Sequence, residues 1–161
     1  MVVEQRDDVY WMQAALRLAQ QAANAGEVPV GAIVVIDNNI VGQGFNQPIS
    51  SCDPTAHAEM MALRDAAKKI ENYRLVDATL YVTLEPCTMC AGAIVHGRIK
   101  RLVYGAKEPK AGAIESQSEL LKMPYMNYRV DAMGGICEQE SSELISAFFA
   151  KRRAQKKAAS R

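Results

Sequence analysis

The first pattern in the chain is a stripe of apolar residues at helical spacing. It consists of Met12, Ala15, Leu16, Ala19, Ala22 and Ala23. Residues that recur at intervals of three and four lie on one face of a helix, so the spacing predicts an amphipathic helix here. Gly26 follows the stripe directly and is a typical stop signal.

The next pattern is typical of a hairpin followed by a second helix. Val30–Ile36 is a β-branched run, and the turn residues 37–39 separate it from a second apolar run at Ile40–Phe45. After the polar loop 46–52, either Asp53 or Thr55 is a suitable helix cap. Pro54 suits the first turn of that helix. Its apolar face continues with Met60, Leu63, Ala67 and Ile70.

A compact strand-helix-strand unit follows. Thr79–Leu84 alternates apolar and other residues, and the stripe that comes next ends at Gly97. That stripe contains Cys87, Cys90, Ala91, Ile94 and Val95. A further strand is predicted at Ile99–Tyr104. Because a helical crossover joins the two strands, we expect them to be parallel.

The remainder completes an α/β pattern. We expect a loop over 106–115, a short helix at Ser116–Lys122, a short strand at Tyr128–Ala132 and a final helix from about Glu138. That helix carries Leu144, Ile145, Phe148 and Phe149, of which one phenylalanine is expected in the core because adjacent helical residues diverge. Without repeats or linkers, the pattern predicts one α/β domain over 1–161 with a mixed sheet.

Composition narrows the class of protein. The 161 residues are 49% hydrophobic and 23% charged, which is typical of a soluble globular protein. No apolar run reaches transmembrane length, and the N-terminus lacks the layout of a signal peptide. The four irregularly spaced cysteines favour reduced thiols over a disulfide framework. We therefore expect a cytoplasmic protein that has no contact with membranes.

The net charge of +1 conceals a basic C-terminal tail. Residues 151–161 hold six of the 19 basic residues and no acidic residue. The first 150 residues accordingly carry 13 basic and 18 acidic side chains. A basic tail is either a solvated helix end or a surface that contacts nucleic acid.

Candidate chemistry begins with Cys87 and Cys90, which follow a strand at C-x-x-C spacing. Pro86 favours a helical turn there, and a helix N-terminus stabilises thiolates. Such a pair is typical of a redox site, a structural zinc site or a catalytic zinc site. The chain has two histidines. His96 stands at the far end of the same predicted helix, where a role at the helix C-terminus is the simpler interpretation.

His57 is the histidine that could join the two thiols. One histidine and two cysteines give zinc three protein ligands, which is the number in catalytic sites that keep a fourth position open. A closed site with Cys52 or Cys137 as fourth ligand remains possible, although neither has paired spacing. Glu59, two residues after His57, is then a candidate to transfer protons. In a regular helix the two side chains would diverge, so we expect an irregular helix start or a metal beyond its end.

Together, His57-Ala58-Glu59 and Pro86-Cys87-Thr88-Met89-Cys90 form the H-x-E…P-C-x-x-C signature of zinc nucleobase deaminases. The stretches PVGAIVV, GFNQPI, DPTAHAEMMALR, NYRLVDATLYVTLEPCTMCAGAIVHGRI and SAFFAKRR resemble the TadA family of bacterial tRNA-specific adenosine deaminases. The resemblance covers residues from about 10 to 157. It implies a three-layer cytidine-deaminase fold, a five-stranded mixed sheet with helices on both faces, and a homodimer.

The resemblance also implies a reaction and residue roles. The family converts adenosine to inosine at the wobble position of tRNA(Arg), with one Zn²⁺ per subunit. His57, Cys87 and Cys90 would hold zinc, and Glu59 would transfer protons. The expected contacts with the anticodon stem-loop are Asn46, which matches the family's asparagine, Ala58, Glu108, and, in the aromatic and basic tail, Phe149, Arg152 and Arg153. Glu108 departs from the aspartate often found there, which puts its ribose contact in question.

Two other functions are compatible with the residues alone. A small-molecule guanine or cytosine deaminase would use the same zinc site, although a free base needs no basic tail. A thiol redox or zinc-structured binding protein would use only the cysteines. In that case Glu59 would have no role in activity.

Overall fold

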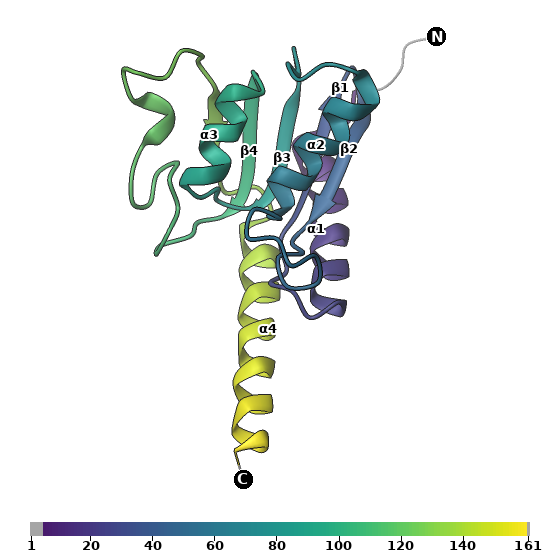
Figure 1. The fold of residues 1–161 in the computed structure, drawn as a ribbon, viewed down its shortest axis with the longest axis vertical. Helices are drawn as coiled ribbons and strands as arrows, with labels where there is room; N and C mark the ends of the chain where they lie inside the picture. Colours follow the sequence, from purple (N-terminus) through teal and green to yellow (C-terminus); the bar gives the residue numbers. More distant parts are fainter. Residues whose placement is uncertain (1–4, 161) are drawn as a thin grey trace.

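The computed structural model describes residues 5–160 and shows one five-stranded sheet between two layers of helices (Figure 1). In chain order the elements are α1 (Asp8–Asn24), β1 (Gly31–Ile36), β2 (Asn39–Phe45), α2 (Ala58–Ile70), β3 (Thr79–Leu84), α3 (Thr88–His96), β4 (Arg101–Ala106), the 3-10 helix η1 (Leu120–Lys122), β5 (Asp131–Met133) and α4 (Glu138–Ala159). The expected limits at Met1 and Arg161 lie outside the described residues.

The sheet is mixed, as the sequence predicts. Its strand order is β2-β1-β3-β4-β5. Strand β1 is antiparallel to β2 and β3, whereas β3, β4 and β5 are parallel. The parallel pair β3–β4 is joined by α3, so the predicted strand-helix-strand unit is confirmed.

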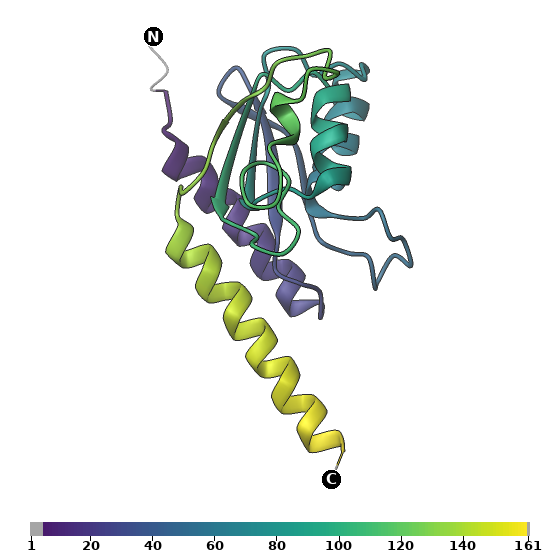
Figure 2. The same cartoon turned by 90° about the vertical axis from the view of Figure 1, so that its left-hand side faces the viewer.

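Helices α2 and α3 cover one face of the sheet, and α1 and α4 lie against the other (Figure 2). Each face has its own buried cluster. Val34, Leu80 and Leu102 pack with α2 and α3, whereas Ile33, Tyr81 and Val103 pack with α1. Neighbouring strand residues point to opposite faces, so β1, β3 and β4 are apolar on both sides. The three-layer fold is therefore confirmed.

Helix α1 follows its sequence pattern closely. Asp7 caps it by accepting a hydrogen bond from the Tyr10 N–H at 2.8 Å. The expected stop at Gly26 is also confirmed, because this residue follows the helix with φ +80°, a conformation that glycine adopts readily.

Helix α2 packs unusually close to strand β2 at Gly42. A Cβ atom at this glycine would lie 2.5 Å from the Ala62 carbonyl oxygen and 2.6 Å from the Ala66 Cβ. The backbone of the helix therefore occupies the space where a side chain would stand. This contact holds helix α2 against the sheet, and α2 begins directly after His57.

We expect Gly42→Ala to lower the free energy of unfolding by about 1–3 kcal/mol, because the added methyl group forces helix and strand apart. Urea denaturation of both proteins measures this difference. Gly92→Ala is the matched control, since a Cβ atom added at Gly92 would have no neighbouring atom within 4 Å. Equal loss of stability in both variants would contradict the account of this contact.

The predicted start of the second helix is wrong. Helix α2 begins at Ala58, with His57 in the N-cap position and neither Asp53 nor Thr55 capping it. Asp53 is engaged in its own turn, where Oδ1 accepts from the N–H and the hydroxyl of Thr55, both at 2.8 Å. This local turn competes with a helix start.

Three predicted elements in the second half are shifted or shortened. Strand β4 begins at Arg101, because Ile99 donates its N–H to Ile94 in the turn that ends α3. The helix expected at Ser116–Lys122 is reduced to η1, and the last strand begins at Asp131, where pairing with β4 begins. Buried residues in turns, such as Ile99, resemble strand residues in the sequence pattern.

Helix α4 begins at Glu138 as predicted and projects beyond the sheet toward the C-terminus (Figures 1 and 2). The expectation of a core phenylalanine is wrong: Phe148 is half-buried and Phe149 is 39% exposed. The distal part of α4 extends past the body of the protein, so no core encloses these rings. None of the described helices combines the length and apolar character needed to cross a membrane.

Candidate metal centre and recess

Cys87 and Cys90 lie at the start of α3, as the sequence predicts. Cys87 occupies the N-cap position with extended backbone, and Cys90 lies in the first turn with its side chain fully buried. Strand β3 ends three residues before Cys87, so the sheet fixes the point where the helix begins. Both thiols consequently face the same end of the sheet.

His57 brings its imidazole to these thiols from the start of α2. Its Nδ1 atom lies 3.6 Å from the Sγ atoms of both Cys87 and Cys90. Among residues 5–160, these three form the one group of His, Cys, Asp or Glu side chains arranged to hold a metal, with all ligand atoms within 4.8 Å. Cys52 is exposed in a loop, and Cys137 lies near Gln13 instead.

The donor set fits a zinc ion chemically. Imidazole nitrogen and thiolate sulfur are preferred zinc ligands, and three protein ligands leave a position open. The hydrogen bond from Cys90 and the contact with His57 together outweigh burial and lower the pKa of Cys87 to about 3. The same hydrogen bond, together with burial, raises the pKa of Cys90. The two thiols therefore differ, and Cys87 is the one that these contacts favour as a thiolate.

Glu59 lies in the first turn of α2 and is 4% exposed. Burial raises its pKa above the ordinary value. His57 has φ −72° and ψ 155°, which is extended and not helical. The irregular start expected from the i, i+2 spacing is therefore confirmed, and both residues line the same recess.

The recess has a volume of about 170 Å³ and lies where strands β1 and β3 meet the helix starts. It is lined by Val28, Val30, Asn46, His57, Glu59, Leu84, Glu85, Cys87, Glu108 and Ala111. Its apolar lining residues are Val28, Val30, Leu84 and Ala111, and the candidate metal ligands His57 and Cys87 line it together with Glu59. A single aromatic base is the kind of ligand that such a small, half-apolar recess can take.

Asn46 joins the recess to helix α2. Its Oδ1 atom accepts the N–H of Ala58 at 2.9 Å and so serves the helix start from a distant loop. With the oxygen engaged, the NH₂ group of Asn46 is the part able to donate to a ligand. The side chain of Ala58 is fully buried, and its N–H is bonded to Asn46.

Two buried carboxylates hold the loops beside the recess, and the sequence analysis missed both. Glu27 accepts hydrogen bonds from the N–H groups of Ile49 and Ser50 at 3.2 and 2.7 Å. Burial would raise the pKa of Glu27, but these hydrogen bonds outweigh it and lower the pKa. Glu85 holds the loop that carries Glu108 in the same manner. Their partners lie more than 20 residues away, so no local motif identifies them.

The three expected RNA contacts on α4 do not lie in the recess. Phe149 and Arg153 are exposed, whereas Arg152 is half-buried with its guanidinium 5.5 Å from the Phe148 ring. The charge of Arg152 also lowers the pKa of Glu27, which places α4 near the loop that contains Ile49.

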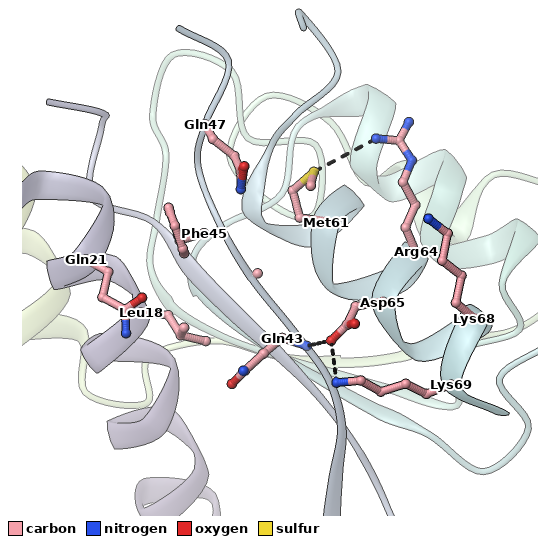
Figure 3. A pocket seen from close by; sticks show the side chains of 11 residues that line it. Leu18, Gln21, Gln43, Phe45, Gln47, Met61, Arg64, Asp65, Lys68 and Lys69 are labelled. Carbon is pink, nitrogen blue, oxygen red and sulfur yellow. Dashed lines mark hydrogen bonds and ion pairs between the residues drawn. The ribbon is translucent and has the colours of Figure 1, made fainter. Parts of the chain in front are cut away.

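A second cavity, of about 480 Å³, lies between α1, β2 and α2 (Figure 3). Its lining includes Arg64, Lys68 and Lys69, and Asp65 accepts from Lys69 and from the Gln43 N–H. Neither a cysteine nor a histidine lines it, so it lacks the thiol and imidazole groups that the predicted chemistry needs. The smaller recess is therefore the candidate site.

Comparisons with known proteins identify the family of the chain. The family model of MafB19-like deaminases matches residues 6–153. A tRNA-specific adenosine deaminase of Haemophilus influenzae is 54% identical over 151 residues, which cover 93% of this chain and 87% of the relative. A solved structure from work on A-to-I editing by tRNA:A34 deaminases at the wobble position of transfer RNA has a TM-score of 0.82 and 43% identity, covering 84% of this chain and 98% of its own.

A solved guanine deaminase from Nitrosomonas europaea is more distant. It has a TM-score of 0.77 and 21% identity, and the match covers 93% of this chain and 87% of that one. At this identity the likeness shows the fold alone. The matches at higher identity decide the relationship, and the chain belongs to the family of the tRNA-specific adenosine deaminases.

Proposed function

We propose that the chain is a zinc-dependent hydrolase that converts adenosine to inosine at the wobble position of the anticodon of tRNA(Arg). One observation carries the proposal: His57, Cys87 and Cys90 converge beside buried Glu59 at a recess that suits one base. The identity to a tRNA-specific adenosine deaminase gives the substrate class.

His57, Cys87 and Cys90 would hold one zinc ion in each chain. When bound, zinc supplies Lewis acidity that makes a water molecule nucleophilic at neutral pH. The chain's own contribution is to fix three ligands on two helix starts and to leave one side open to the recess. Neither cysteine would cycle through a disulfide in this account.

Glu59 would carry the protons of the reaction. Hydrolysis replaces the C6 amino group of adenosine by oxygen and releases ammonia, so protons move from the attacking water to the ring nitrogen and to the leaving nitrogen. A carboxyl group that is buried beside the reacting carbon can accept and return each proton. The raised pKa of Glu59 favours its protonated form more than for an exposed glutamate.

Asn46, Ala58 and Glu108 would position the nucleoside. The Asn46 NH₂ group can donate to a base or sugar, and the backbone at Ala58 is fixed by the same side chain. Glu108 lines the recess from the loop after β4, where its carboxylate could accept from a ribose hydroxyl. The remaining nucleotides would lie outside, since the recess is smaller than the ~300–1,000 Å³ of ordinary ligand pockets.

Helix α4 would bind the anticodon stem-loop outside the recess. Arg153 and Phe149 offer an exposed cation for phosphate and an exposed ring for base stacking. Arg152 would contact the RNA from its half-buried position over the Phe148 ring, where its charge also acts on Glu27. A cytoplasmic location is proposed because tRNA substrates are found there. A homodimer is proposed from the family resemblance.

Removal of residues 151–161 is expected to weaken binding of the full tRNA and to reduce the dependence of its affinity on salt. Each lost phosphate contact reduces the slope of log affinity against log salt by about 0.7–0.9. Filter binding at several salt concentrations measures the slope, and deamination of a minimal stem-loop should be affected less. Equal slopes for the full and shortened chains would contradict a role of α4 in RNA binding.

The proposed function is tested by turnover on different substrates. Zinc-loaded protein is incubated with an anticodon stem-loop and, separately, with adenosine, adenine, guanine and cytidine. We expect inosine from the stem-loop and much slower turnover of the four small molecules. Faster turnover of guanine or cytidine than of the stem-loop would instead indicate a small-molecule deaminase.

A further inference from the structure

Glu85 is a buried acidic residue for which the proposed chemistry has no role. It directly follows strand β3, and its side chain is 2% exposed. Its own N–H donates to the Ala106 carbonyl at 2.8 Å and so continues the pairing of β3 with β4. The residue is therefore fixed at the end of the sheet, two positions before Cys87.

Within residues 5–160, all hydrogen-bond donors to the Glu85 carboxylate belong to one loop, residues 107–116. The N–H groups of Glu108, Ile114, Glu115 and Ser116 donate to it at 3.0, 3.1, 2.8 and 2.9 Å. The Ser116 hydroxyl donates to it as well. Hydrogen bonds to an ionised acceptor are stronger than those between neutral groups. This carboxylate can therefore hold both ends of the loop in place.

Gly112 leaves the space that the carboxylate occupies. A Cβ atom at this position would lie 2.3 Å from the Glu85 Cδ and 2.4 Å from its Oε1. The middle of the loop therefore passes over the carboxyl group with no room for a side chain. The ends of the loop bond to Glu85, and its centre packs upon it.

This loop forms one side of the recess. Glu108 and Ala111 line it together with His57 and Asn46, and Glu85 itself contributes to the lining. The position of Glu108 is set at its backbone N–H, which is one of the groups that Glu85 holds. A shift of the carboxylate would therefore move the side chain that faces the substrate.

We propose that Glu85 is a positioning residue that holds the 107–116 loop in place as the substrate-facing side of the recess. The inference rests on the proposed function for its kinetic consequence, and on the hydrogen bonds alone for its structural part. Glu85 neither binds the metal nor transfers a proton in this account. Its effect on the substrate passes through Glu108 and the loop backbone.

The test is Glu85→Gln in the full zinc-loaded protein. Glutamine keeps the shape, but its NH₂ group faces N–H donors that it cannot bond. We expect the KM for the stem-loop to rise about tenfold, while kcat per bound zinc changes by less than about threefold. Amide exchange measured by NMR should become faster at Glu108, Ile114, Glu115 and Ser116.

Gly112→Ala tests the same contact from the loop side, because its methyl group displaces the carboxylate. It should raise the KM in the same way, and the double variant should be no worse than the poorer single variant, since both disrupt one contact. Glu119→Gln is the matched control. Glu119 is exposed and forms an ion pair with Lys122. The Glu119→Gln variant should therefore keep the wild-type KM and the wild-type amide exchange.

Two results would overturn the inference. Unchanged protection of the four amides in Glu85→Gln would show that the carboxylate does not hold the loop. Faster exchange with an unchanged KM would show a structural role only. A wild-type protein that does not deaminate the stem-loop would contradict the proposed function, and the amide exchange would still decide whether Glu85 holds the loop.

Discussion

Glu59→Gln should abolish deamination while the protein keeps one zinc ion per chain. Glutamine fills the same buried space but cannot accept and return a proton. General acid–base catalysis contributes about 10²–10⁴-fold to a rate, so kcat should fall by at least that range. Because Glu59 lies outside the group of metal-ligand atoms, zinc content should remain unchanged.

The measurement combines single-turnover kinetics with metal analysis of the same sample. Glu71→Gln serves as the control, since Glu71 lies exposed at the other end of α2 and should behave as wild type. Retention of activity in Glu59→Gln with zinc bound would exclude Glu59 as the proton carrier. It would also favour a redox or structural role for the cysteine pair.

Cys90→Ser should remove both the metal and the activity. The Cys90 side chain is fully buried and lies 3.6 Å from His57 Nδ1, so no water-accessible group can replace it as a ligand. Metal that is present at 100 times its Kd stabilises a folded protein by about 2.7 kcal/mol. The variant should lose this stabilisation by metal. Its melting temperature should no longer respond to added zinc.

Cys52→Ser is the matched control for this experiment. Cys52 is exposed, and its thiol lies near only the Ile49 carbonyl. Zinc content, melting temperature and turnover should all stay at wild-type values. Loss of zinc from the Cys52 variant would indicate a closed four-ligand site, and full activity of Cys90→Ser without metal would contradict the zinc hydrolase.

The central part of the site could be predicted from the sequence because its geometry is local. Cys87 and Cys90 share the first turn of one helix, and their spacing alone places both thiols together. His57 was the remaining imidazole at a helix start, and the structure brings it to the thiols. The divergence expected between His57 and Glu59 disappears because His57 precedes the helix in an extended conformation.

The surroundings of the site depend on contacts between distant residues and could not be predicted in this way. The Asn46 side chain accepts a hydrogen bond from the first residue of α2, which lies 12 residues further along the chain. The Glu85 carboxylate accepts hydrogen bonds from a loop that lies 23 to 31 residues away. In the sequence each is an ordinary polar residue beside a proline or a strand. Only the fold shows that each one serves a backbone group of another element.

The predicted boundaries of the elements are wrong where a residue is buried but is not paired in a strand. Ile99 is fully buried, so the apolar pattern assigned it to a strand, although it belongs to the turn after α3. Phe148 and Phe149 continue an apolar pattern along α4, but neither ring is buried in the core. Periodicity indicates which face of a helix is apolar but not where the neighbouring layer ends.

The most direct test of the central claim is sequencing of cDNA from total tRNA that was treated with the zinc-loaded protein. Inosine is read as guanosine, so deamination appears as an A-to-G change at the edited position. We expect this change at the wobble position of tRNA(Arg), with no change after treatment with Glu59→Gln protein. An unchanged wobble position in tRNA treated with active, zinc-loaded wild-type protein would contradict the proposed function.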